Sequence, residues 1–363
     1  MKSKMIQIFK NIFILRKKIS VYKLFSTRHR RIFNNGEFIR NNLTRSEKRK
    51  YKEYWGKISK TVNFETVEIC KSLSGKFDVK IIPEEIFELY IQPCLQSVKN
   101  LTFLANKNIY NKWFEKGLFP KDYFHKINGA FYDPDLNLIP DFKKYLLMLD
   151  IDYPVVLKPS IDSSGGEGIL FLDSKKEIEE NLKLLEYAVV QDIIQQHTEL
   201  DVISSNGLNT IRVCLLKRPS NSEIAVLNTS LRMGKDGGLD NETAGGIVCN
   251  ISNKGILNSF AVDALGKKYY KHPNTGFVFK EKKLPRYEEL LVTSKRIAEK
   301  IVYANLIGLD MCLDHEGVWR CIEVNLKYQS IRFAQYAGRP FFGEYTDEVI
   351  QYILEKNRKQ NGI

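Results

Sequence analysis

The sequence predicts an α+β fold, and three observations support this prediction. Residues 153–172 are typical of a strand, a glycine-rich loop and a second strand, and residues 308–325 are typical of a β-hairpin, with two apolar runs around a turn-forming cluster. Between them, residues 286–305 carry apolar side chains such as Leu290 and Ile297 at the spacing of one helical face. The chain therefore combines antiparallel strands with amphipathic helices.

The first 60 residues differ in charge from the rest of the chain. They hold 18 Lys and Arg against 3 Glu, whereas the remainder is nearly neutral and the whole chain of 363 residues has a net charge of +13. We expect a mostly helical arm here. Its apolar run over residues 5–15 is too short to span a bilayer, which takes about 20 residues, and no signal-peptide cleavage site follows it. A solvated or mobile arm and a basic helix lying on an anionic membrane surface both explain this composition.

The other segments follow from turn residues and apolar spacing. Residues 45–150 have a mostly helical pattern, and residues 153–260 are rich in strands. We expect one helix at about 175–187, a strand at 188–194 and a closing helix at 347–359. The expected units are an N-terminal arm (1–60), a helical or α+β domain (61–150), a lobe with the glycine-rich loop (151–200), a lobe with the C-terminal hairpin (201–345) and a C-terminal helix (346–363).

The six cysteines indicate neither disulfides nor a zinc site. None forms a CxxC pair, and the five histidines have no metal-site spacing. Small buried thiols are typical of a reducing compartment, so we expect a cytoplasmic protein, at the inner face of the membrane if the arm binds lipid. Nothing in the body of the chain requires nucleic acid, and we expect none to bind. The cysteines in apolar, strand-like runs are Cys214, Cys249, Cys312 and Cys321.

The glycine-rich loop has the composition of a phosphate-binding loop. Glycines lack a Cβ, so backbone N–H groups can approach a phosphate closely, and Lys158 at the end of the preceding strand would add a point charge. The loop is not a Walker A motif, because no Gly-Lys-Ser/Thr follows it, and not a dinucleotide fingerprint, because a strand follows it. A loop of this kind is also common in ordinary hairpins. Its candidate residues are Ser163, Ser164, Gly165, Gly166 and Gly168.

The C-terminal hairpin brings three oxygen ligands to one face. Glu323 and Asn325 lie two residues apart and share a face of their strand. If the turn centres on residues 316–317, Asp310 lies directly opposite Glu323, and if it centres on 315–316, Asp310 lies diagonal to Glu323 on the same face. Carboxylates of this kind hold Mg²⁺ together with substrate phosphates. The alternative is that Asp310 and Glu323 are solvated residues of a one-sided sheet.

Two arginines, Arg212 and Arg232, lie in strand-like runs. An arginine that points into a cleft must be paired, because an unpaired buried charge is costly, and phosphate or carboxylate is its natural bidentate partner. A salt bridge or an outward-facing surface position is the alternative, particularly for Arg232, which ends its strand.

The order of these features resembles the ATP-grasp superfamily. More narrowly, it is similar to the sugar-transfer-associated ATP-grasp family, whose members are predicted to act in cell-surface polysaccharide biosynthesis. The resemblance covers about residues 60–345 and implies two α+β lobes that clamp ATP between antiparallel sheets. It is carried by the short motifs at 128–133, 158–168, 208–212, 240–246, 272–276 and 323–325.

For the nucleotide, the resemblance implies that Lys107 and Lys158 contact ATP phosphates and that the glycine-rich loop folds over the β- and γ-phosphates. Glu199 or, as a second choice, Asp201 would bind the ribose. The chain departs from the commoner Glu at the hinge beneath adenine, where the contacts are mainly made by the backbone. The implied hinge residues are Gln191, Asp192, Ile193 and Ile194.

For the reaction, the resemblance implies Mg²⁺ on the three hairpin ligands, with Arg212 and Arg232 balancing the charge that develops. Asn241 would close over an acyl phosphate, and His272 would contact the acceptor or act as a base, unless its role is structural. The acceptor pocket would use parts of residues 60–150 and 325–343. Its candidates in the second range are Tyr328, Gln329, Arg332 and Arg339.

We therefore expect an ATP-dependent carboxylate–amine ligase. A substrate carboxylate would attack the γ-phosphate, and an amine would then displace phosphate from the acyl phosphate. The family context implies a uronic-acid sugar or an amino acid as one substrate. The alternatives are a phosphotransferase acting on a hydroxyl and a non-catalytic nucleotide-binding partner of a glycosyltransferase. The sequence specifies neither the acceptor nor the oligomeric state.

Overall fold

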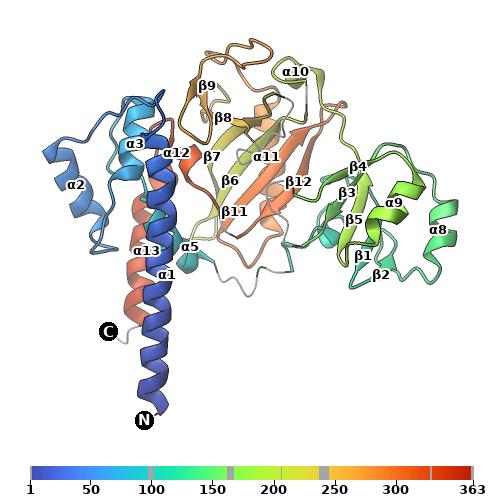
Figure 1. Ribbon diagram of the computed structural model, residues 1–363, viewed down its shortest axis with the longest axis horizontal. Helices are drawn as coiled ribbons and strands as arrows, with labels where there is room; N and C mark the ends of the chain where they lie inside the picture. Colours follow the sequence, from blue (N-terminus) through green and yellow to red (C-terminus); the bar gives the residue numbers. More distant parts are fainter. Residues whose placement is uncertain are drawn as a thin grey trace.

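The computed structural model describes residues 2–96, 101, 103–161, 167–205, 207–236, 245–327 and 329–360. Two antiparallel β-sheets lie beside each other. A group of helices packs against the larger sheet at the end of the molecule that is far from the smaller sheet (Figure 1). The predicted α+β fold is confirmed by this arrangement.

The large sheet has seven strands in the order β10-β9-β8-β7-β6-β11-β12. Side chains alternate across its strands, so Ile211 and Leu309 are buried on one face, in a core that includes Leu290 of α11 (Tyr287–Glu299), while Arg212 and Asp310 lie on the other face. The strands are β6 (Thr210–Lys217), β7 (Ile224–Met233), β8 (Ile247–Ile251), β9 (Leu257–Val262), β10 (Lys268–Tyr269), β11 (Leu306–Leu313) and β12 (Trp319–Asn325).

The small sheet has five strands in the order β2-β1-β5-β3-β4. Its outer face packs against α8 (Phe142–Met148) and α9 (Lys175–Leu182) through residues such as Leu146 and Ile178. The strands are β1 (Asp122–Ile127), β2 (Ala130–Tyr132), β3 (Val155–Pro159), β4 (Leu170–Leu172) and β5 (Ala188–Asp192).

Two strands of the small sheet were missed by the sequence analysis. β1 and β2 lie in the segment expected to be mostly helical, and β1 pairs with β5 along four residues. The sheet therefore crosses the domain boundary expected between residues 150 and 151. β1 escaped notice because Asp122, Tyr123, Phe124 and His125 are all buried, so polar and apolar residues do not alternate along the strand.

The helical lobe, which we define as α1 to α5 with η1, α12 and α13, has its own core. Trp55, Ile86 and Ile353 are fully buried there, so the C-terminal helix, expected as a separate unit, packs with the N-terminal helices. The lobe also covers Cys214 and Leu306 of the large sheet, on the same face as Arg212. Its elements are α1 (Lys2–Phe33), α2 (Arg45–Trp55), α3 (Glu65–Ser74), α4 (Glu84–Ile86), the π-helix η1 (Phe87–Ile91), α5 (Gln92–Leu95), α12 (Arg332–Gln335) and α13 (Thr346–Gln360).

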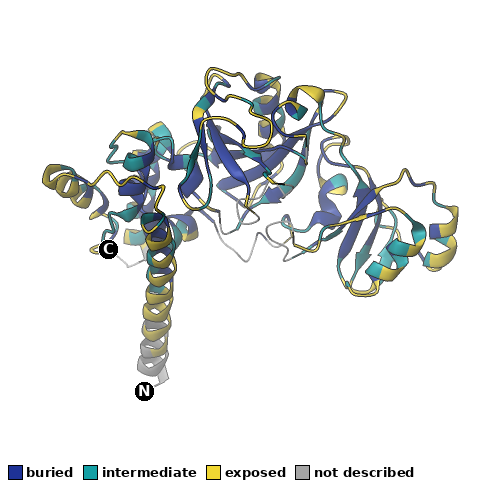
Figure 2. Cartoon of the chain, turned by 45° about the horizontal axis from the view of Figure 1, so that its top comes forward, coloured by how far each residue is buried: buried dark blue, intermediate teal, exposed yellow. Residues whose placement is uncertain are grey.

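The two halves of α1 differ in exposure (Figure 2). Val21, Phe25 and Ile32 are buried, whereas Phe9 and Phe13 are exposed. The expectation of a solvated arm is therefore wrong beyond about residue 20, because the later apolar side chains of α1 pack into the helical lobe. None of the described helices is long and apolar enough to cross a membrane. Contact of the exposed half with a membrane surface stays a prediction.

Several predicted elements end earlier than expected. α9 begins after Ser174, whose side chain accepts from the Glu177 N–H, but ends at Leu182 rather than 187, and α11 ends at Glu299 rather than 305. All six cysteines are free, and the four in strands are buried, as predicted. The short helices are η2 (Lys107–Ile109), α7 (Tyr110–Trp113), α10 (Thr198–Asp201) and η4 (Gly343–Tyr345).

Candidate active site

The register of the hairpin β11–β12 places Asp310 directly opposite Glu323, the first of the two predicted registers. Asn325 pairs with Gly308, two residues further along, so its side chain lies on the same face as Glu323. Beyond Asp310 a bulge shifts the pairing by one residue, which neither predicted register contained. The site therefore lies on the regular side of the bulge.

Asp310 is the centre of a charged network on this face. Its oxygens accept from Arg212 Nε at 2.6 Å and Nη2 at 2.9 Å, and from Asn325 Nδ2 at 3.0 Å, while Arg232 Nη1 lies 3.4 Å from Oδ1. The carboxylate is only 5 % exposed, so the alternative of a solvated Asp310 is wrong. The outward-facing alternative for Arg232 is also wrong, because its guanidinium points inward to Asp310.

Electrostatics keep Asp310 ionised. Burial by itself would raise the pKa of this carboxyl, but Arg212 and Arg232 outweigh burial and lower the pKa to about 2. The two arginines are therefore paired, as expected, and their partner is Asp310, which is the salt bridge named as the alternative; binding of a phosphate by these arginines stays a prediction.

Lys107 joins the network from outside the large sheet. It lies on the 3₁₀ turn η2, its Nζ is 2.8 Å from Glu323 Oε1, and the residue is buried. Its backbone N–H donates to the Ser160 carbonyl just after β3, at 3.0 Å. Lys107 is therefore not an ordinary surface lysine, and it connects the end of a small-sheet strand to the hairpin carboxylate.

Lys158 points from β3 toward the same region. Burial and the neighbouring Lys107 both lower the pKa of its amine, and Glu323 and Asp122 act in the opposite direction. Within the described residues the Lys158 side chain makes no hydrogen bond or ion pair, although its backbone belongs to the ladder between β3 and β5. It is thus a half-buried cation that nothing described in the chain neutralises directly.

The inner face of the small sheet carries two further titratable groups that the sequence analysis missed. Gln191 donates to Asp122 Oδ1 at 2.7 Å, and His125 Nε2 lies 3.6 Å from Asp122 Oδ2. Burial raises the pKa of Asp122 to about 6 and lowers the pKa of His125 to about 4. Residues three apart on a regular strand face opposite sides, and the register shift between Asp122 and Phe124 brings these two together.

The hinge residues lie at the end of β5. Asp192 is the last residue of the strand and donates its N–H to the Lys121 carbonyl at 2.9 Å. Asp192, Ile193 and Ile194 line a cavity of about 810 Å³, together with the hairpin tip around His315. Asp122 also lines this cavity, and its carboxyl is near enough to Lys158 to oppose the lowering of that amine's pKa by burial, so the hinge cavity adjoins the cationic cluster.

The two ribose candidates differ in their surroundings. The Glu199 side chain is 62 % exposed on the short helix α10. Asp201 Oδ1 accepts from Gln196 Nε2 at 2.7 Å, which gives that carboxylate an internal partner. Glu199 therefore has the freer carboxylate, in line with its first place in the prediction, but no observation assigns either residue to a ribose.

His272 does not have the geometry of a catalytic base, and that prediction is corrected. The residue is 1 % exposed, its Nε2 is bonded to the Gly234 carbonyl at 2.9 Å, and its Nδ1 accepts from the Thr275 N–H at 3.4 Å. Both ring nitrogens are therefore used by backbone groups, which fixes the chain after β7. The structural alternative for His272 is the better description.

The other predicted residues divide into described and undescribed ones. Gly168 has φ +76°, and a Cβ there would meet Pro159 Cγ at 2.8 Å, so the loop requires glycine where it rejoins the strand. Gln329 and Arg332 are buried, and Gln329 donates to the Asn325 and Leu306 carbonyls, whereas Arg339 is exposed. The predictions for Ser163, Ser164, Gly165, Gly166, Asn241 and Tyr328 lie outside the described residues.

The donor set of the hairpin fits a hard divalent cation. Two carboxylates and one amide on one sheet face match the oxygen preference of Mg²⁺. The described residues contain no group of three His, Cys, Asp or Glu that could hold a metal, because the third member here is Asn325. Lys107 and the two arginines neutralise the carboxylates in this structure, so a cation would have to share those oxygens with them.

Solved structures with a distantly similar fold include ligases and carboxylases. An L-amino acid ligase from Bacillus licheniformis is 12 % identical, with a TM-score of 0.38 and 73 % of this chain covered, and a D-alanine–D-alanine ligase from Bacillus anthracis complexed with ATP is 14 % identical, with a TM-score of 0.40 and 70 % covered. A biotin carboxylase–ATP complex from Campylobacter jejuni is 13 % identical, with a TM-score of 0.44 and 72 % covered.

The shares of these structures that the chain matches are 48 %, 68 % and 48 %, so it spans about half the length of two of them. No curated protein matches the sequence. The sequence model of one family, sugar-transfer associated ATP-grasp, matches residues 89–347. This match covers well over half of the chain, and the predicted resemblance is thereby confirmed: the protein belongs to the sugar-transfer associated ATP-grasp family and has the ATP-grasp fold.

Proposed function

We propose that this protein is an ATP-dependent ligase that joins a carboxylate to an amine through an acyl phosphate, with Mg²⁺ as its metal. The observation that carries the proposal is the cluster of cations around two carboxylates where the sheets face each other. Arg212 and Arg232 surround Asp310, Lys107 binds Glu323, and Lys158 lies close enough to Lys107 to lower its own pKa. Phosphoryl transfer depends on such positioning and charge neutralisation, because the protein itself needs no covalent step.

The residues would divide the work by charge. Asp310, Glu323 and Asn325 would hold the magnesium ion, which supplies charge neutralisation at the β- and γ-phosphates. Lys158 would donate to a phosphate oxygen and so gain the partner that it lacks among the described residues. Arg212 and Arg232, already close to Asp310, would turn part of their hydrogen bonding to the transferred phosphoryl group.

Atoms and charges balance in this route. A substrate carboxylate oxygen attacks the γ-phosphorus, the bond to the bridging oxygen breaks, and ADP leaves. The amine nitrogen of the second substrate then attacks the acyl carbon, phosphate leaves, and the nitrogen loses a proton. The family description supports a substrate from sugar transfer, and therefore a role in cell-surface polysaccharide biosynthesis, including capsule.

The test is ³¹P NMR of the protein with Mg-ATP and pools of nucleotide sugars, uronic acids and amino acids. We expect ADP and free phosphate to appear only when both a carboxylate and an amine are present. Glu323→Gln should reduce the rate by at least 100-fold, the size expected when an electrostatic group of an active site is lost. Glu289→Gln is the matched control, because Glu289 is an exposed carboxylate on α11 that does not line the described cavities.

Two other outcomes would replace the proposal. A new phosphate-ester signal without free phosphate would identify a phosphotransferase that acts on a hydroxyl. ATP binding without turnover in any pool would identify a non-catalytic nucleotide-binding partner of a glycosyltransferase. Full activity of Glu323→Gln would remove the metal assignment.

A further inference from the structure

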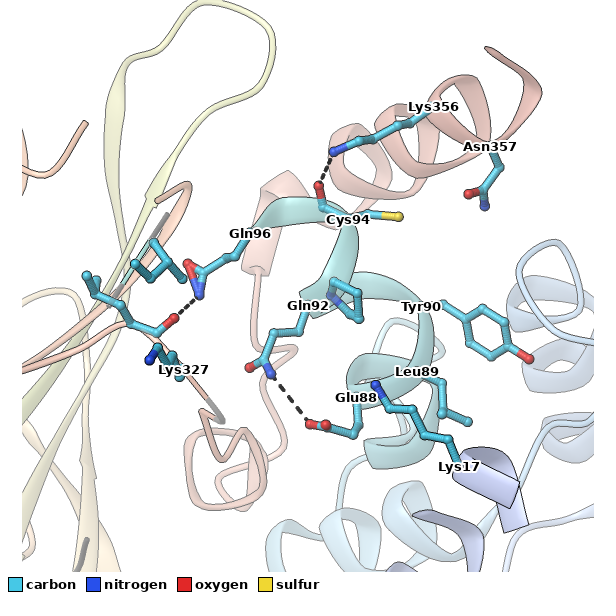
Figure 3. A pocket seen from close by; sticks show the side chains of 13 residues that line it. Lys17, Glu88, Leu89, Tyr90, Gln92, Cys94, Gln96, Lys327, Lys356 and Asn357 are labelled. Carbon is cyan, nitrogen blue, oxygen red and sulfur yellow. Dashed lines mark hydrogen bonds between the residues drawn. The ribbon is translucent and has the colours of Figure 1, made fainter. Parts of the chain in front are cut away.

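A second cavity, of about 580 Å³, lies where the helical lobe meets the end of β12 (Figure 3). It is lined by residues of α1, η1, α5 and α13, and by Leu326 and Lys327, the two residues after Asn325. A strand rises about 3.3 Å per residue, so Lys327 lies within roughly 7 Å of the proposed metal ligand along the chain. That is about the width of one sugar ring, so the cavity begins one sugar length along the chain from the proposed metal ligand.

The wall of the cavity is bonded to the metal-ligand strand. Gln92 Oε1 accepts from the Gln329 N–H at 3.0 Å, and Gln329 Nε2 donates to the Asn325 carbonyl at 3.0 Å. Gln96, the next cavity residue on this wall, donates to the Leu326 carbonyl and accepts from the Leu306 N–H. Two glutamines from the helical segment therefore hold the chain on either side of the hairpin base, which fixes the cavity wall relative to the strand that carries Asn325.

The helix that forms this wall is irregular at the cavity. η1 is a π-helix of five residues that contains Glu88, Leu89 and Tyr90, all of which line the cavity. π-Helical turns are rare, and they are found frequently at functional sites. The extra residue in this turn changes which side chains face the cavity, and it is a second indication of a binding role that does not depend on the cavity's size.

The lining combines cationic and aromatic chemistry. Lys17, Lys327 and Lys356 face a single acidic residue, Glu88, whose pKa burial raises and Lys17 lowers. Lys356 Nζ donates to the Cys94 carbonyl at 2.6 Å, which fixes that ammonium group at the rim. The Tyr90 ring has Lys18 Nζ over it at 5.4 Å from the centroid, and the residue also carries a hydroxyl. Amide, hydroxyl and aromatic groups suit a sugar ring, and the excess of lysines suits an anion.

We propose that this cavity binds the carboxylate-bearing substrate and that this substrate is an acidic sugar, with its carboxylate toward Lys327 and the phosphoryl-transfer site. The assignment rests on the proposed ligase function, since only that reaction needs a carboxylate beside the γ-phosphate. Lys17 and Lys356 would then bind a second acidic or hydroxyl group of the same molecule. Glu88 repels such a ligand and neutralises Lys17 in its absence.

The test uses the full chain and two single variants that are expected to change the affinity for the acidic sugar in opposite directions. Binding of sodium glucuronate and sodium galacturonate is measured by saturation-transfer NMR in the presence of Mg-ADP, with glucose as the neutral sugar. We expect the uronates to bind and glucose to bind at least tenfold more weakly. Lys17→Ala should weaken uronate binding roughly tenfold, the size of one charge-assisted hydrogen bond. Glu88→Gln should strengthen it severalfold, because it removes the repulsive charge.

Lys23→Ala is the matched control, because it removes the same charge from an exposed position of the same helix that does not line the cavity. It should leave uronate binding unchanged. A purely structural role of Lys17 and Glu88 would shift both variants in the same direction, and equal binding of uronate and glucose would overturn the acidic-sugar assignment. Mg-ADP binding, measured separately by calorimetry, distinguishes this failure from a failure of the proposed ligase function, which would remove nucleotide binding or turnover.

Discussion

The two sheet faces that meet at the candidate active site differ in whether their buried charged groups have partners within the protein. On the large sheet, Asp310 is held by two arginines and an asparagine. On the small sheet, the Lys158 side chain makes no hydrogen bond or ion pair, and Asp122 Oδ2 and His125 Nε2 have no hydrogen-bond partner, within the part of the chain that is described. The large-sheet face is completed internally, whereas the small-sheet face leaves capacity for a ligand, and buried groups of that kind are characteristic of functional sites.

The difference indicates two ways of preparing an active site. A paired network keeps its charges fixed at little net gain in stability, and breaking it is costly because the remaining charge stays buried. An unpaired cation lowers the stability of the free protein and recovers that energy when an anion binds. Lys107 is intermediate, because it comes from the segment beside the small sheet and yet pairs with Glu323 of the large sheet.

The largest expected effect comes from removing one arginine of the paired face. Arg212→Met leaves Asp310 buried with Arg232 and Asn325 as its remaining described partners, and we expect a loss of about 3–5 kcal/mol in the free energy of unfolding. The measurement is urea denaturation of the free protein. Arg218→Met is the control, because Arg218 forms more exposed salt bridges with Glu223 and Glu348, and its loss should change stability far less.

The same substitution on the other face should act in the opposite way. Lys158→Met removes a charge without a described partner, so we expect unchanged or higher stability of the free protein, together with a loss of ATP affinity of at least tenfold. Denaturation and ATP titration calorimetry measure the two effects. A destabilisation as large as that of Arg212→Met would show that the two faces do not differ, and the comparison would fail.

A smaller effect is expected in how the unfolding free energy depends on pH, to which Asp122 and His125 contribute with opposite signs. The folded-state pKa of Asp122 is raised to about 6, so acidification from pH 6 to 4 favours the folded state. The folded-state pKa of His125 is lowered to about 4, so acidification from pH 6.5 to 4 favours the unfolded state. In the parent protein the two effects oppose each other. Relative to the parent, Asp122→Asn should lose stability on acidification and His125→Gln should gain it, by about 1–3 kcal/mol each over this window.

Chemical denaturation at pH 6.5, 5.5 and 4.5 measures this difference. The double variant is the control, because it should again follow the parent across the window. If both single variants show the same dependence of unfolding free energy on pH as the parent, burial does not perturb the pKa values of these groups. The small-sheet face would then not differ from the large-sheet face in this respect.

The smallest expected effect concerns the two ribose candidates on α10. If Glu199 binds the ribose, Glu199→Gln should weaken ATP binding a few-fold but leave stability within about 0.5 kcal/mol, because its side chain is exposed. Asp201→Ala should instead cost about 1 kcal/mol of stability, because Gln196 loses its carboxylate partner. Repeating the titrations with 2′-deoxy-ATP identifies the ribose contact. Substitution of the residue that binds the ribose 2′-hydroxyl should reduce the affinity for 2′-deoxy-ATP less than the affinity for ATP.

The sequence by itself determined the elements whose patterns are local. The strand–loop–strand at Lys158, the hairpin that brings Asp310 and Glu323 to one face, and the buried cysteines all follow from side-chain alternation, turn residues and apolar runs, whereas the structure chose between the two possible registers of the hairpin. The family followed from the order of short motifs, and the match over residues 89–347 agrees with it. These features need only the chain's neighbours in sequence, which is why they could be predicted.

Only the tertiary structure decided which charges meet. Arg212 and Asp310 are 98 residues apart and pair because β6 and β11 are adjacent. Asp122 and His125 share a face only because of a register shift in β1, which no residue pattern announces. His272 has a structural role because the distant Gly234 carbonyl and the nearby Thr275 N–H use its two ring nitrogens. Strand order and register, which the packing of whole sheets sets, decide these contacts both for partners 98 residues apart, such as Arg212 and Asp310, and for close neighbours such as Asp122 and His125.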